Sequence, residues 1–194
     1  MVGFIKALTA VIIAMMIQGG VSGAVETTPE EAVSDFVTGL MAGDEQIVER
    51  YVDNEYINFL ANAEADDETK ARISKALFKN LKYDIEDTAL KGGAAVVEAR
   101  ISTNDFSDVM DEYKEVSYSY VKENLYDEDI TDKDKLSAKC LDIYVDQIEK
   151  DAEEKASLEK KVYIPMIEDG YGGWKLLLSD DIVKTLMGQL SIPK

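Results

Sequence analysis

The sequence contains no histidine among its 194 residues, and this absence removes several kinds of chemistry. Ser-His-Asp and Cys-His catalysis both need an imidazole base, and histidine is the usual general base near neutral pH. Imidazole metal sites are excluded for the same reason. We therefore predict no catalytic, cofactor-binding or metal-binding residues and no cofactor, and we expect the protein not to be an enzyme.

Cysteine is almost as scarce, because Cys140 is the single one in the chain and one thiol cannot form an internal disulfide. Without disulfides, packing must hold the fold together. Cys140 lies on a helical apolar stripe with Leu136 and Tyr144, which predicts a small buried side chain. A disulfide between two chains is the alternative, and a non-reducing gel that shows only monomer would exclude it.

Basic residues are also few, since 21 Lys and Arg accompany 39 Asp and Glu, a formal net charge of −18. Such a chain repels phosphate backbones and anionic lipid headgroups, and no Lys/Arg cluster offers a local exception, so we expect no nucleic-acid binding. The charge indicates a soluble protein that self-repulsion keeps dispersed. An acidic face that meets a basic partner or loose cations is the alternative.

The first 24 residues have the order of a signal peptide. Lys6 is followed by an apolar run, Ala7 to Ile17, and then by small and polar residues up to Ala24. As a helix the run would span about 16 Å, well short of the hydrocarbon core of a bilayer. We predict cleavage after Ala24, with cleavage after Gly23 as the alternative, and no stable membrane anchor afterwards.

The residues around this site also bear on localisation. Val21-Ser22-Gly23 is similar to the start of a bacterial lipobox, but Ala24 stands where the lipidated cysteine would be required. We therefore expect a secreted or extracytoplasmic protein that is not a lipoprotein. The mature chain, residues 25–194, has no internal repeat and no low-complexity linker, which predicts a single domain.

Local signals predict helices at the start of this domain. Thr28-Pro29-Glu30-Glu31 combines a capping box with proline at the first helical position. An apolar stripe from Ala32 to Met41 follows it. Asp44 caps a second, short helix that includes Val52, and a third helix carries a stripe from Ile73 to Phe78.

The period of apolar residues then changes from 3.6 to 2, which predicts strands. Gly92-Gly93 is a hairpin turn, and the strand that follows places Ala95, Val97, Ala99 and Ile101 on one face. A second hairpin joins a strand around Val162 to Met166, through the glycine-rich residues 169–173, to a strand from Trp174. Pro165 predicts that its strand lies at an edge or carries a bulge. Ser179 caps a final helix.

Residues 106–158, between the two hairpins, form a helix-rich insertion. One apolar stripe includes Tyr113 and Tyr120, another includes Leu136 and Tyr144, and a polar segment joins them. Each stripe is one-sided, which predicts an antiparallel helical hairpin that lies on another surface.

This order of elements, ending in a hairpin with Trp174, resembles the nuclear-transport-factor-2-like cone fold, also seen in ketosteroid isomerases. Exported bacterial members of unknown function show similar motifs: Thr28-Pro29-Glu30-Glu31-Ala32-Val33, Met41-Ala42-Gly43-Asp44, Glu168-Asp169-Gly170 and Gly173-Trp174-Lys175-Leu176. The resemblance covers most of the mature chain. It implies an α+β domain with a cone-like, curved antiparallel sheet packed on N-terminal helices, and an insertion that covers one side of the sheet or the mouth of the cone.

An acidic segment between the two insertion helices offers the clustered oxygens that calcium prefers: Asp127, Asp129, Thr131, Asp132 and Asp134. The EF-hand pattern fails at two positions, because Asp132 replaces the required glycine and Ala138 replaces the required glutamate. A solvated loop between helices fits these residues better.

Two further groups have both a functional and a structural interpretation. Asp87 is the one acid on the apolar face of its strand, beside Tyr83, which would suit an isomerase-type site, but the end of a strand near a turn explains it equally well. Tyr113, Tyr118 and Tyr120 mark one helix face, which would suit an interaction surface. We favour packing of these tyrosines against the sheet.

We favour an exported, non-catalytic domain that binds a small ligand or a protein partner. One rival is an isomerase- or hydrolase-type enzyme that uses carboxylate and tyrosine groups, which would need a closed apolar pocket with a desolvated acid. The other is a structural oligomerisation module such as a homodimer, since open sheet faces of the cone fold often pair. A cavity filled by Trp174, Leu176 and the first helix would favour protein contact through the insertion.

Overall fold

The computed structural model describes residues 27–42, 44, 47, 50–52 and 67–191. The predicted signal peptide, residues 1–24, lies outside the described residues. Within the described part of the chain, no helix is both long enough and apolar enough to cross a membrane.

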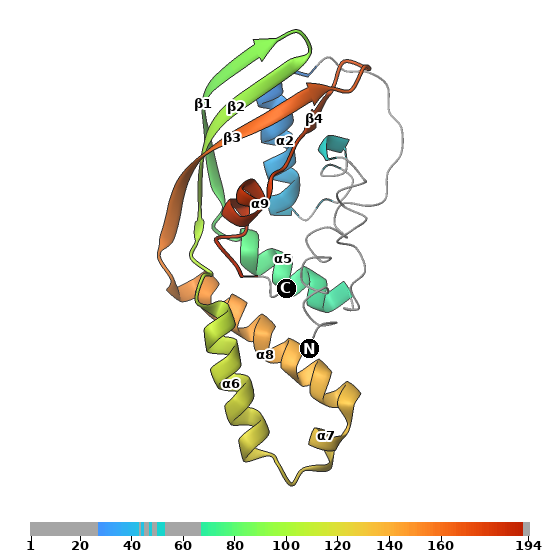
Figure 1. Ribbon diagram of the computed structural model, residues 1–194, viewed down its shortest axis with the longest axis vertical. Coiled ribbons are helices and arrows are strands. Elements are labelled where there is room, and N and C mark those ends of the chain that lie inside the picture. Colours follow the sequence, from blue (N-terminus) through green and yellow to red (C-terminus); the bar gives the residue numbers. More distant parts are fainter. Residues whose placement is uncertain (1–26, 43, 45–46, 48–49, 53–66, 192–194) are drawn as a thin grey trace.

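A four-stranded antiparallel sheet in the order β1-β2-β3-β4 forms the centre of the fold (Figure 1). Its strands are β1 (Lys82–Lys91), β2 (Ala94–Asn104), β3 (Ser157–Glu168) and β4 (Trp174–Leu176). Alternate residues of the two central strands are buried, as a period of two predicts. They are Ala95, Val97, Ala99 and Ile101 on β2, and Val162, Ile164 and Met166 on β3.

Both hairpin turns are confirmed, and both use glycine where the backbone φ is positive. Gly92 and Gly93, between β1 and β2, have φ values of 57° and 78°, as in the two-residue turns that match strand twist. Between β3 and β4, the Asp169 side chain accepts hydrogen bonds from the N–H groups of Tyr171 and Gly173 at 2.8 and 3.0 Å.

Helices α2 (Pro29–Ala42) and α9 (Asp180–Leu186) cover one face of the sheet, and α5 (Asp67–Phe78) packs beside them (Figure 1). α2 begins with the predicted capping box, because Glu31 N–H donates to Thr28 Oγ1 at 3.2 Å and Thr28 N–H donates to Glu31 Oε2 at 2.8 Å. Ser179 caps α9 as predicted. Val52 does not continue the second helix but makes an isolated parallel bridge with Leu176.

The core fills the space between the sheet and these helices. Phe36 of α2, Leu77 of α5, Trp174 of β4 and Leu186 of α9 are all buried in it. Burial of each such large apolar side chain stabilises the fold by roughly 1.5–3 kcal/mol. The indole Nε1 of Trp174 also donates to the Thr27 carbonyl at 2.9 Å, which ties β4 to the chain just before α2.

The insertion forms an arm of three helices, α6 (Val109–Glu123), α7 (Glu128–Thr131) and α8 (Lys133–Glu154), which confirms the predicted helical hairpin. Contrary to expectation, the arm covers neither the sheet nor the mouth of the cone but extends away from both, with α8 packed against α6 and α5 (Figure 1). The cause is ionic. Arg72 of α5 contacts three acids of α8 at 3.0, 2.9 and 2.7 Å: Asp142, Asp146 and Glu149.

Asn104, the last residue of β2, anchors the base of the arm. Its Nδ2 donates to the carbonyls of Asp151, Ala152 and Lys155 at 3.2, 3.0 and 3.2 Å. These carbonyls lie at the C-terminal end of α8, where a helix leaves carbonyl groups without partners of its own. The whole arrangement is the predicted α+β class, a curved antiparallel sheet packed on helices with a helical hairpin between the two β-hairpins.

The prediction for Pro165 is wrong, because β3 is an inner strand that pairs regularly with both β2 and β4. A residue in an antiparallel strand directs its N–H and its C=O toward the same neighbour. The Pro165 carbonyl accepts the Leu177 N–H at 2.8 Å, so the position of the missing N–H faces the chain just beyond the short strand β4. The ladder with β2 therefore loses no hydrogen bond.

Two glycines with similar backbone angles allow a matched test of packing at the base of the arm. Gly188 and Gly92 have φ values of 58° and 57°, but a Cβ at Gly188 would collide with the Asn104 carbonyl and lie 2.7 Å from Phe106 Cδ2. A Cβ at Gly92 would meet nothing within 4 Å. We expect Gly188→Ala to lower the free energy of unfolding by about 3 kcal/mol or more, from backbone strain and overpacking together.

The control, Gly92→Ala, carries the backbone strain alone and should cost about 1–2 kcal/mol. Urea denaturation of both variants against the wild type measures the difference. Equal losses in the two variants would contradict the packing of Gly188 against β2.

Candidate functional site: the outer face of the sheet

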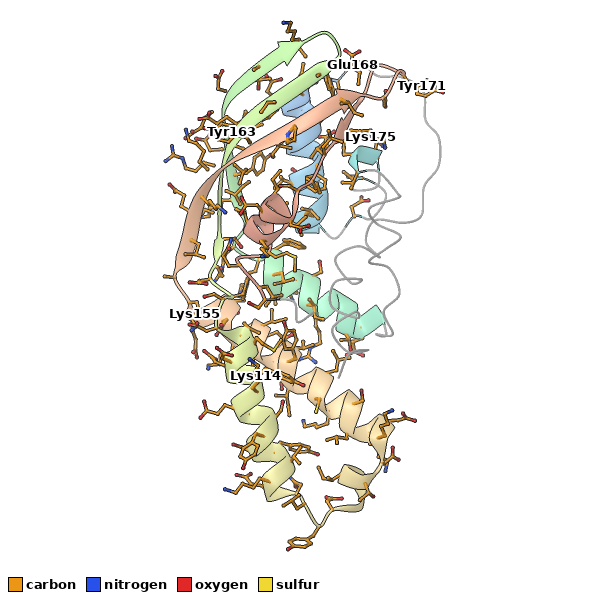
Figure 2. The ribbon with its side chains drawn as sticks, viewed as in Figure 1. Lys114, Lys155, Tyr163, Glu168, Tyr171 and Lys175 are labelled. Atoms are coloured by element: carbon orange, nitrogen blue, oxygen red, sulfur yellow. The ribbon has the colours of Figure 1, made fainter. Side chains whose placement is uncertain are left out.

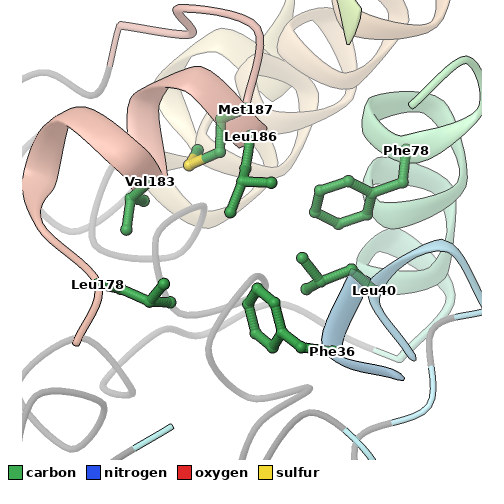
Figure 3. A pocket seen from close by; sticks show the side chains of 7 residues that line it. All are labelled: Phe36, Leu40, Phe78, Leu178, Val183, Leu186 and Met187. Carbon is green, nitrogen blue, oxygen red and sulfur yellow. The ribbon is translucent and has the colours of Figure 1, made fainter. Parts of the chain in front are cut away.

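Buried apolar side chains of the described residues pack against the inner side of the sheet. A cavity of about 20 Å³ lies between α2, α5 and α9 (Figure 3), which is room for about one water molecule. Ligand pockets usually measure about 300–1,000 Å³. The side chains around the cavity are all apolar, so none of them can orient a polar ligand or exchange a proton: Phe36, Leu40, Phe78, Leu178, Val183, Leu186 and Met187.

The opposite face of the sheet, which we call the outer face, is left uncovered by the described residues (Figure 1). Four side chains form one row across β1, β2, β3 and the residue that follows β4, and we call them the apolar row: Ala89, Val96, Pro165 and Leu177. Ala89 pairs with Val96 and Val96 with Pro165, and Leu177 donates its N–H to Pro165. Paired residues share a face of the sheet, so the row is continuous.

On either side of the apolar row lies a further row of paired residues, which we call a rung, and the two rungs add apolar side chains to the surface. On one side Lys91 pairs with Ala94, and Ala94 with Ile167. On the other side Asp87 pairs with Glu98, and Glu98 with Tyr163, which lies on β3 (Figure 2). The large members of this surface are well exposed: Val96 39%, Leu177 44%, Ile167 45% and Tyr163 58%. Side chains of this size grouped on one open face are typical of a surface that contacts another molecule.

Further along the strands, the outer face carries a ladder of ion pairs. Arg100 of β2 binds Glu86 and, at 3.1 Å, Glu159, while Lys161 of β3 binds Glu98 and, at 2.7 Å, Glu86. The hydrogen bonds from Lys161 and Arg100 lower the pKa of Glu86 to about 2. Glu86 therefore keeps its charge from neutral pH down through 4.5, its ordinary pKa, and its ion pairs with Arg100 and Lys161 weaken as the pH falls toward 2.

Counted over the described residues, the outer face is electrically neutral, although the chain has a net charge of −18. It carries as many basic as acidic side chains, assigned by pairing and by ion pairs: Lys82, Lys91, Arg100, Lys161 and Lys175 against Asp84, Glu86, Asp87, Glu98 and Glu159. This face therefore lacks the excess of acidic groups that the rest of the chain carries, and another acidic surface can approach it with little repulsion.

A family model described as a domain of unknown function, DUF5105, matches residues 27–190 of the chain. The chain belongs to the DUF5105 family. A comparison with curated proteins finds no match.

Among solved structures, this DUF5105 domain is similar to a crystal structure from Bacillus subtilis subsp. subtilis named a "putative lipoprotein (ycdA)". The TM-score is 0.54 and the sequence identity 21%, over 81% of this chain and 54% of that protein. At this identity the similarity bears on the fold alone. The chain spans about half the length of that protein, and the resemblance to the nuclear-transport-factor-2-like cone stays a prediction.

Asp87 does not lie on the apolar face where the sequence pattern places it. A β-bulge between Ile85 and Asp87 inserts Glu86 and shifts the register, and one extra residue turns every following side chain to the other face. Tyr83 stays on the inner face, where its hydroxyl lies 2.6 Å from Ser34 Oγ, while Asp87 is exposed on the outer face. The structure therefore separates the acid from the tyrosine that an isomerase-type site would pair with it.

The acidic segment of the DUF5105 arm has a structural role at one of its residues. Asp132 Oδ1 caps α8 by accepting the N–H groups of Asp134 and Lys135 at 3.0 and 3.2 Å. Among the residues that the structure describes, no group of three His, Cys, Asp or Glu side chains could hold a metal ion.

The tyrosines of α6 do not share one face. Tyr113 packs edge-on against Tyr144 of α8, with ring centroids 5.3 Å apart, and Lys139 lies over the Tyr120 ring, so these two face α8 and not the sheet. Tyr118 points away from them and is 70% exposed. Cys140 is a free thiol that is half-buried on α8, less deeply than its apolar stripe predicts.

The outer face was not identified as a site by the sequence pattern, although part of its signal is present. Alternation alone places Val96, Tyr163 and Ile167 opposite the buried residues of their strands. Their union with Ala89 and Leu177 into one row depends on the register of three strand pairs and on the bulge in β1. No local pattern in the sequence carries that information.

Asp151, at the base of the arm, is a buried acid that the sequence pattern also did not single out. It is 0% exposed, and neither of its carboxylate oxygens has a hydrogen-bond partner. Burial raises the pKa of Asp151, the acids Glu112 and Asp108 of α6 raise it further, and Lys155 and Lys150 oppose them. A charged Asp151 therefore costs stability, and the cost applies at pH values above 3.8, the ordinary pKa of the group.

We expect Asp151→Asn to raise the free energy of unfolding at pH 7 by on the order of 1 kcal/mol, because an amide loses less on leaving water than a carboxylate does. The gain should shrink as the pH falls toward 3.8, since the raised pKa lets the buried wild-type carboxyl take up its proton in the folded state. Urea denaturation of both proteins at pH 7 and pH 4 measures it.

Asp108→Asn is the matched control at the same joint, because Asp108 is exposed and its carboxylate contacts Lys155 at 3.2 Å. This control should change stability little at either pH. A loss of stability in Asp151→Asn at pH 7 would contradict the assignment of Asp151 as a buried acid without partners.

Proposed function

We propose that this DUF5105 domain is an exported, non-catalytic module that binds another protein through the outer face of its sheet. The observation that carries the proposal is the apolar row across β1, β2, β3 and the residue that follows β4, exposed on a face that no described residue covers. Exposed apolar surface of this kind is costly in water and becomes favourable when a partner covers it.

The inner side of the sheet supports a protein partner over a small ligand. Trp174, Leu176 and Phe36 are buried there, and the cavity that the described residues enclose between α2, α5 and α9 is far smaller than a ligand pocket and has no polar lining. The same cavity offers no desolvated acid, which an isomerase- or hydrolase-type mechanism would require. Asp151, the buried acid, lies at the base of the arm and not among the residues that line the cavity.

The export part of the proposal rests on the N-terminal sequence and on one similar structure. The charged residue Lys6, the apolar run to Ile17 and the small residues up to Ala24 follow the order of a signal peptide. The similar Bacillus subtilis protein is named a "putative lipoprotein", and lipoproteins are an exported class. Ala24, where a lipobox needs cysteine, supports release after cleavage over lipid attachment in this chain.

Photo-crosslinking from two exposed tyrosines tests which surface binds. Replacement of Tyr163 on the outer face, or of Tyr118 on the arm, by a benzoyl-phenylalanine puts the same probe at two sites that are 58% and 70% exposed. We expect a discrete adduct from position 163 in cells that export the protein, and none from position 118. Val96→Lys should abolish the adduct, because it puts a charge in the apolar row.

An adduct from position 118 alone would place binding on the arm and contradict the proposal. So would an adduct from position 163 that Val96→Lys leaves unchanged, because it would not depend on the row.

A further inference from the structure

We propose that the partner of the outer face is a second copy of this chain, stacked face to face about a two-fold axis that runs along the apolar row. The inference rests on the proposed function and names its partner. Three features of the outer face carry it: its neutrality, the symmetry of the row, and the charges of the two rungs beside the row.

Neutrality matters because two copies of this chain repel each other strongly. Each has a net charge of −18, so contact between average surfaces would bring like charges together. The outer face carries equal numbers of basic and acidic side chains, and the ladder around Arg100 and Lys161 already pairs most of its acids. Contact between two outer faces therefore avoids most of this repulsion.

The apolar row suits a two-fold axis because it crosses the strands at right angles. The axis would run along the row, in the plane between two stacked sheets. Each residue of the row then faces the same residue of the second copy, and the strands of the two copies run in opposite directions. Ala89, Val96, Pro165 and Leu177 would then form the centre of the contact. Stacked sheets bury such side chains between faces about 10 Å apart.

With the same axis, the rung on one side of the row in one copy faces the rung on the other side of the row in the second copy. Lys91 of one copy comes over Asp87 of the other, and Ile167 comes over Tyr163, because these residues lie one rung to either side of the row on the same strand. Opposite charges meet at the β1 end and apolar side chains meet over β3. Each contact occurs twice, as an isologous interface requires.

The experiment measures mass against concentration for the protein purified as its host produces it, by light scattering. We expect twice the mass of one chain, and monomer for Val96→Lys. Lys91→Asp should raise the dissociation constant of the dimer about tenfold or more, because it brings two acids together at two symmetry-related places. The double variant Lys91→Asp/Asp87→Lys should restore the wild-type constant, since the exchanged charges meet again across the axis.

Tyr118→Lys on the arm is the control, and its mass should not change. Circular dichroism and the midpoint of urea unfolding show whether each variant stays folded. For a folded variant, a fall in mass from dimer to monomer shows that the substitution disrupts the interface. A dimer that survives both Val96→Lys and Lys91→Asp uses another surface and overturns the inference. A lack of restoration in the double variant overturns the two-fold geometry.

The two proposals fail differently. A protein that is monomeric at every concentration, yet forms an adduct from position 163 with a mass other than that of a second copy, overturns this inference and leaves the proposed function standing. A monomeric protein with no adduct from position 163 overturns both.

Discussion

The pairing of β2 with β3 is the interaction on which the rest of the structure depends. It joins two hairpins that are separated in the chain by the whole arm, and its register runs from Ala94 opposite Ile167 to Asn104 opposite Ser157. Because a strand alternates its side chains between two faces, the register that turns Val97 inward also turns Val96 outward. The filled interior and the exposed apolar row are therefore two consequences of one pairing.

The base of the arm lies where this pairing ends, and three kinds of contact hold it there. Asn104 donates to carbonyls in the last turn of α8, Arg72 forms ion pairs between α5 and α8, and Val145 and Ile148 of α8 are buried in the core. The arm lies beside the helices, and the outer face of the sheet is left open by the described residues.

Local signals in the sequence predicted local structure well. The capping box of Thr28 and Glu31, the Gly92-Gly93 turn and the alternation on β2 each depend on contacts between residues close in the chain, and all are confirmed. The errors concern how the strands pair with one another. An inner strand tolerates Pro165 because β4 ends at Leu176, so the position of the missing N–H faces the chain beyond β4. Asp87 faces outward because a bulge shifts its register.

The sequence by itself determined the class of the fold, the burial of the periodic apolar residues and the exclusion of histidine-dependent catalysis. These follow from composition and local periodicity, which do not depend on which strands pair. The absence of histidine and the charge of −18 hold for any arrangement of this chain. Only the tertiary structure decided that Ala89, Val96, Pro165 and Leu177 form one row. It also decided that the described acidic and basic side chains of the outer face are equal in number. The reason is that residues from separate segments of the chain become neighbours only through the register of the hydrogen bonds between those segments.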